Sequence, residues 1–114
     1  MMLSVSAKLR FFLYGYATDM RKSFEGLGGL VRCHLQEDVQ SGDVYLFINR
    51  RGDRIKLLVW DRDGFWIHYK RLEKGTFRLP SGATDGPEIS YSDLVMLLEG
   101  IDLKRGKKMV RYGR

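Results

Sequence analysis

The chain has 114 residues, with 44% hydrophobic and 30% charged residues, which is typical of one globular domain with a single core. No apolar run approaches the roughly 20 residues that a membrane-spanning helix requires. The single cysteine, Cys33, excludes a disulfide within the chain and, together with the absence of an apolar leader, predicts a cytoplasmic protein without a membrane segment.

The first predicted elements are a strand and a helix. Residues 9–14 are apolar and aromatic and precede Gly15, which predicts a strand that ends there. Thr18 or Asp19 can cap the helix that follows. Its apolar residues recur every three or four positions and therefore share one face: Met20, Phe24, Leu27, Val31 and Leu35. Cys33 lies in this helix, and we expect it to be a small buried or half-buried side chain.

The most regular pattern lies between Tyr45 and Phe77. Short apolar and aromatic runs alternate there with turns at Gly52, Gly64 and Gly75, each beside charged residues. Because glycine tolerates the positive φ of tight turns, the stretch predicts an antiparallel meander of about four short strands.

A loop and a second helix follow the meander. Residues 80–87 have a loop composition, and Ser90 or Ser92 can cap the helix. Its apolar stripe consists of Leu94, Leu97, Leu98 and Ile101. We expect an α+β fold in a single domain over residues 1–103: an antiparallel meander sheet of about five strands, with the two helices packed mainly on one face. Residues 104–114 form a basic C-terminal tail without a periodic apolar face.

Positive charge is concentrated in the meander and the tail. The formal net charge of the whole chain is +6. Nine Arg or Lys residues between Arg50 and Arg78 face four acids, and residues 102–114 carry six bases and one acid. Residues 1–49 balance, and residues 79–101 carry four acids and no base. Clustered positive charge favours a surface for nucleic acid. The alternative is a globular protein whose basic surface is simply solvated.

Alternation along two predicted strands provides candidate DNA contacts. One register gives an apolar face for the helices and a mixed face with Arg54, Lys56, Trp66, His68 and Lys70. Aromatic rings stack on bases and cations hold phosphates. The hypothesised DNA-binding residues are Arg50, Arg51, Arg54, Lys56, Trp66, His68, Lys70, Lys104, Arg105, Lys107 and Lys108. The alternative is that the tryptophans cover the edge of the core and the cations face water.

No group of residues in the sequence argues for catalysis. Turn formation and ion pairing explain the acids of the meander, which are Asp53, Asp61, Asp63 and Glu73. The two histidines, His34 and His68, lack the spacing of metal ligands. We predict no metal site, no cofactor and no enzyme activity.

Three stretches of the sequence resemble one protein family. They are FFLYGYATDMRKSFEGLGGLV at 11–31, LFINRRGDRIKLLVWDRDGFWIHYKRLEKGTFRLP at 46–80 and LLEGIDL at 97–103. They are similar to the small accessory protein, often called TnpB, of the insertion-sequence-66 family of bacterial transposable elements. The similarity runs nearly end to end, and the runs TDMRK at 18–22 and NRRGD at 49–53 are its specific parts. At 114 residues the chain cannot be the large RNA-guided nuclease that shares this label.

The resemblance implies a role in transposition, the DNA recombination of a mobile element. It implies a protein that is encoded beside a larger DDE-type transposase and has no catalytic residue of its own. We expect a non-catalytic accessory protein that binds DNA. The alternative is an adaptor that docks on the transposase or another element-encoded protein, through an aromatic sheet face or the helix at residues 94–101. The sequence predicts no particular oligomeric state.

Overall fold

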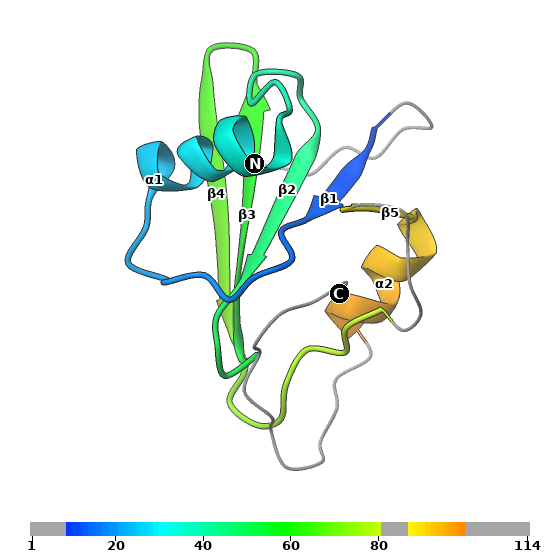
Figure 1. Cartoon of the computed structure of the whole chain (residues 1–114). Helices are drawn as coiled ribbons and strands as arrows, with labels where there is room; N and C mark the ends of the chain where they lie inside the picture. The colour runs from blue at the N-terminus through cyan, green and yellow to red at the C-terminus, as the bar shows by residue number, and fades with distance from the viewer. Residues whose placement is uncertain (1–8, 81–86, 100–114) are drawn as a thin grey trace.

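The computed structural model describes residues 9–80 and 87–99, which form a five-stranded sheet and two α-helices (Figure 1). The elements are, in chain order, β1 (Phe11–Leu13), α1 (Phe24–Leu30), a π-helical segment η1 (Val31–Leu35), β2 (Val44–Ile48), β3 (Arg54–Asp61), β4 (Gly64–Arg71), β5 (Glu88–Ile89) and α2 (Tyr91–Glu99). The predicted α+β class and the predicted number of strands are confirmed. The predicted tail at 104–114 and most of the predicted loop at 80–87 lie outside the described residues.

The strands are ordered β4-β3-β2-β1-β5, and the sheet is mixed, although mostly antiparallel. β1 runs parallel to β2, with Phe11 opposite Val44. The expectation of a wholly antiparallel sheet was therefore wrong at this pair. The cause is the helix between the two strands: α1 and η1 carry the chain back along the sheet, so that β2 starts at the same end as β1. The meander itself has three strands, β2 to β4, rather than about four.

The two helices lie on opposite faces of the sheet, which corrects the prediction of one helical face. Leu27 and Val31 of the first helical region pack on the face that we call the α1 face. Leu94 and Leu97 of α2 pack on the other, the α2 face. The physical reason is the composition of the strands, because β1 and β2 are buried on both faces and each face needs its own cover.

Successive side chains of the inner strands point to opposite faces of the sheet. The α1 face takes Phe12, Tyr45, Phe47 and Leu58. The α2 face takes Phe11, Leu13, Val44, Leu46, Ile48, Ile55, Leu57 and Val59. One core cluster therefore forms on each side of a single sheet.

The helix starts differ in how well the sequence predicts them. Ser90 caps α2 as expected, because its Oγ accepts a hydrogen bond from the Asp93 N–H at 3.1 Å. The first helix begins at Phe24, with Ser23 at its cap position, and not at Thr18 or Asp19. The Asp19 carboxylate instead accepts a hydrogen bond from the Arg21 N–H at 2.9 Å and closes a turn before the helix.

Candidate nucleic-acid interface

The register of the β3–β4 hairpin divides the predicted mixed face between the two sides of the sheet. Lys56 pairs with Tyr69, whereas Trp66 pairs with Val59. Since paired residues share a face, Arg54 and Lys56 lie on the α1 face, and Trp66, His68 and Lys70 lie on the α2 face. These five residues therefore do not form one surface.

The reason lies in the turn between the two strands. The turn has two residues, Arg62 and Asp63, and Arg62 adopts the positive φ of 55°. Gly64 is already the first residue of β4. A face shared by Arg54 and Trp66 would need an odd number of loop residues, because one residue more or less moves a whole strand to the opposite face.

Lys56 is not placed to contact DNA. Its side chain is buried, with 8% of the residue exposed. The ammonium donates hydrogen bonds to the carbonyl oxygens of Met20 and Lys22, each at 2.8 Å. The structure argues against the hypothesised DNA contact of Lys56, because backbone oxygens hold its charge inside the fold.

Trp66, His68 and Lys70 do share the outer part of the α2 face. The rings of Trp66 and His68 stack with their centroids 6.2 Å apart. The Trp66 indole N–H donates to Asp61 Oδ2 at 3.2 Å, and 43% of the residue is exposed. A partly exposed ring of this kind can stack on another flat group.

The β2–β3 loop lies at one end of the sheet (Figure 1). The segments that meet at this end carry a stronger concentration of positive charge. The chain after β4 returns to this loop through two backbone hydrogen bonds of 2.8 Å: Leu72 N–H donates to Asp53 O, and Phe77 N–H donates to Gly52 O. These bonds bring together basic residues that are far apart in sequence. We call them the basic end: Arg50, Arg51, Arg54, Lys70, Arg71, Lys74 and Arg78.

Few acids neutralise the basic end. Arg71 pairs with Glu73 at 3.3 Å, but both side chains are more than half exposed, so water screens the pair. Arg54 donates to the Tyr69 hydroxyl at 3.2 Å. Within the described residues, no ion pair holds the five remaining cations, which are Arg50, Arg51, Lys70, Lys74 and Arg78.

The loop at the basic end is held in one conformation by Asn49. Its Oδ1 accepts hydrogen bonds from the Asp53 and Arg54 N–H groups at 3.1 and 3.0 Å, and its Nδ2 donates to the Asp53 carboxylate at 2.8 Å. Gly52 completes the turn with a φ of 78°. Arg50 and Arg51 therefore lie exposed at the tip of an ordered turn. The acid nearest to them in the sequence, Asp53, is bound by the Asn49 side chain.

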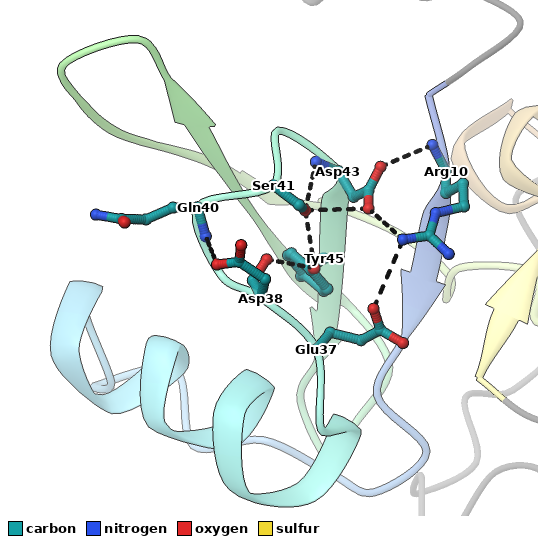
Figure 2. A network of polar contacts seen from close by, with 7 residues as sticks. All are labelled: Arg10, Glu37, Asp38, Gln40, Ser41, Asp43 and Tyr45. Atoms are coloured by element: carbon teal, nitrogen blue, oxygen red, sulfur yellow. Dashed lines mark hydrogen bonds and ion pairs between the residues drawn. The ribbon is translucent and has the colours of Figure 1, made fainter.

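Arg10 lies near the opposite end of β2 and, unlike the arginines of the basic end, it is paired with acids (Figure 2). Arg10 is paired with Asp43 at 3.0 Å and with Glu37 at 3.7 Å. Its hydrogen bond to Asp43 raises the pKa of the guanidinium above the usual value. Ser41 joins this group, since its Oγ contacts both Asp43 and the hydroxyl of Tyr45, whose pKa is raised by burial. Positive charge at this end is thus compensated within the fold.

The remaining features are the single cysteine, possible metal ligands and possible membrane-spanning helices. Cys33 is exposed, so the expectation of a buried or half-buried side chain was wrong. Across residues 9–80 and 87–99, no group of three or more His, Cys, Asp or Glu side chains could hold a metal ion. None of the helices in these ranges is long and apolar enough to cross a membrane.

Sequence reasoning missed part of the basic end. Arg71, Lys74 and Arg78 were counted in the charge of the meander but were not singled out. Only the backbone contacts of residues 72–77 with the β2–β3 loop reveal that they join Arg50 and Arg51. The hypothesised tail contacts Lys104, Arg105, Lys107 and Lys108 lie outside the described residues.

The described part of the chain is a small mixed α+β domain with a basic end whose positive charge exceeds that of the acids described beside it. The chain belongs to the family of IS66 Orf2-like proteins, whose family model matches residues 9–108. The resemblance to the insertion-sequence-66 accessory protein TnpB is thereby confirmed, and the protein is a transposition-associated accessory protein.

Two relatives match over nearly the whole chain, and both come from Sinorhizobium fredii (strain NBRC 101917 / NGR234). The uncharacterized protein y4jC is 31% identical over 94% of this chain and 92% of its own length. The uncharacterized protein y4hO is 31% identical over 96% of each chain. No solved structure matches the chain.

Proposed function

We propose that the protein is a cytoplasmic accessory factor of transposition that binds DNA without catalysing a reaction on it, and that the basic end is the contact surface. One observation carries the proposal. Among residues 9–80 and 87–99, three separate segments bring seven bases together with Asp53 and Glu73 as the acids within those segments, a net charge of +5. A polyanion is the natural counterpart of such a surface.

The geometry favours contacts with phosphates over contacts with base edges. Arg50 and Arg51 lie on a short turn and not on a helix that could enter a major groove. Cations that touch phosphates give affinity and position without reading sequence. Trp66 lies four residues along β4 from Lys70, about 13 Å. A nucleic-acid base stacked on the Trp66 ring would therefore lie outside the basic end.

The experiment is a titration of the whole protein with a duplex of about 20 base pairs at several salt concentrations. Each phosphate contact contributes a slope of roughly −0.9 to the plot of log affinity against log salt. The double variant Arg50→Gln, Arg51→Gln should therefore reduce the magnitude of the slope by about 2. Arg62→Gln with Lys22→Gln is the matched control, because it removes the same charge away from the loop tip.

Either of two results would reject the proposal. One is the absence of a salt-dependent interaction between the wild-type protein and DNA. The other is an equal loss of affinity in the loop-tip variant and in the control variant, since net charge alone would then explain binding.

A second candidate function is that of an adaptor for the transposase of the element. The observation in its favour is on α2, where Tyr91 is 56% exposed and Met96 is 47% exposed. An adaptor should co-purify with the transposase and bind DNA weakly. Met96→Glu should abolish that co-purification, whereas Phe24→Glu, at a residue of 46% exposure in α1, should preserve it.

A further inference from the structure

The last strand of the sheet presents a long free edge. β4 pairs with β3 on one side and ends the strand order, so no strand of the described residues pairs with its outer side. The strand has eight residues, GFWIHYKR, with no proline, and its Trp66 and Tyr69 are 43% and 50% exposed. An apolar edge of this length offers a row of N–H and C=O groups for another strand.

We propose that the outer edge of β4 pairs antiparallel with the β4 of a second copy of this chain, centred on Ile67, so that two sheets become one. A two-fold axis perpendicular to the sheet keeps each face on its own side, so paired residues must come from the same face. Centres at Ile67 and at His68 each match seven residues of β4, and Ile67 is the one that brings Arg71 opposite Asp63. It places Phe65 opposite Tyr69, and Trp66 opposite His68, of the second copy.

The charges at the two ends of β4 are complementary in this arrangement. Arg71 and Lys70 mark one end, and the turn with Asp63, beside Asp61, marks the other. Antiparallel pairing brings Arg71 of each copy to Asp63 of the other. A parallel pairing would instead put the two basic ends side by side, where like charges repel.

Gly64 provides the space for a second contact. A Cβ built at Gly64 would have no heavy atom within 4 Å, so the surface above it is open. In the proposed register, Lys70 of the second copy lies opposite Gly64. Asp61 is the cross-strand partner of Gly64 on β3 and shares its face. The Lys70 ammonium can therefore extend over the glycine toward the Asp61 carboxylate.

The test is a charge exchange, read as molar mass by sedimentation of the full chain at about 50 mM salt, where charge contacts are weakly screened. The wild type should sediment as a dimer of the 13.3 kDa chain. Arg71→Glu and Asp63→Arg each create two like-charge contacts per dimer, and each should weaken dimerisation by about tenfold or more. An equimolar mixture of the two variants restores both opposite-charge contacts and should dimerise as the wild type does.

Folding is a small concern for these variants. Arg71 lies opposite Arg54 across the hairpin, so a glutamate there relieves a like-charge pair, and Asp63 is exposed in the turn. Arg51→Glu is the control, because it makes the same charge change away from β4 and should leave the dimer intact. A monomeric wild type, unaffected single variants, or a mixture that stays monomeric would each overturn the proposal.

Discussion

Lys56 and Tyr69 face each other on neighbouring strands, with the Lys56 ammonium 4.8 Å from the centre of the Tyr69 ring. The same ammonium donates to the backbone oxygens of Met20 and Lys22. One cation thus joins β3, β4 and the segment that leads into α1. Lys56 therefore contributes to the packing inside the fold and not to the charge of the surface.

Replacing Lys56 by Met should lower the free energy of unfolding by about 1–3 kcal/mol, because two carbonyl oxygens lose their donor while the aliphatic packing is kept. Urea denaturation measures the change. Lys70→Met is the control, since Lys70 is exposed, and its effect should stay within about 0.5 kcal/mol. Equal effects at both positions would contradict the structural role of Lys56.

Replacing Gly29 by Ala should raise the free energy of unfolding by about 1 kcal/mol, because alanine is the better helix former. A Cβ at Gly29 would meet no atom within 4 Å. Gly42 is equally open but has a φ of 90°, which side chains rarely adopt. Gly42→Ala should therefore destabilise the protein by about 1 kcal/mol. Thermal unfolding of both variants measures the two changes. Opposite signs would show that the backbone conformation, and not the space for a Cβ, decides the effect.

Asp19 should titrate well below the usual range. The hydrogen bond from the Arg21 side chain, and then that from the Arg21 N–H, lower the pKa of Asp19 from 3.8 to about 2. Its contribution to stability is therefore present above the unfolded pKa and is lost as the pH falls toward 2. Carboxyl NMR should show this midpoint, and Arg21→Gln should raise it. A midpoint near 3.8 in the wild type would show that the pair does not form in solution.

Truncation after Leu103 tests the basic tail. It removes six bases and no acid: Lys104, Arg105, Lys107, Lys108, Arg111 and Arg114. If the tail contacts phosphates, the magnitude of the salt slope for duplex DNA should fall by up to about 5. Circular dichroism should confirm that the truncated protein is folded. Unchanged affinity and slope in a folded protein would confine DNA binding to residues 1–103.

The strands and helix faces were predictable because they depend on local patterns. Leu27 and Val31 were placed on one helical face, and Leu94 and Leu97 on another, and all four are buried. The sheet face that each helix covers was not predictable in this way. It depends on β1 and β2 being apolar at every position, a pattern that requires cover on both sides.

The candidate site was harder to predict than the fold. Arg50 and Arg51 were recognised because the NRRGD turn is a local feature. The separation of Trp66 from Lys56 depends on whether the β3–β4 turn has an even or an odd number of residues, and the alternation within each strand does not encode that number. Arg78 joins the loop through a backbone bond between Phe77 and Gly52, which no periodicity encodes.

The parallel pairing of β1 with β2 also bears on how the chain reaches this fold. Ile48 and Ile55 pair across 7 residues, whereas Phe11 and Val44 pair across 33. Closing the longer loop costs more chain entropy, and the pairing that it forms involves a strand of only three residues. We therefore expect the β2–β3–β4 hairpins to form before β1 docks, with the docking of β1 as the slow step that completes the sheet.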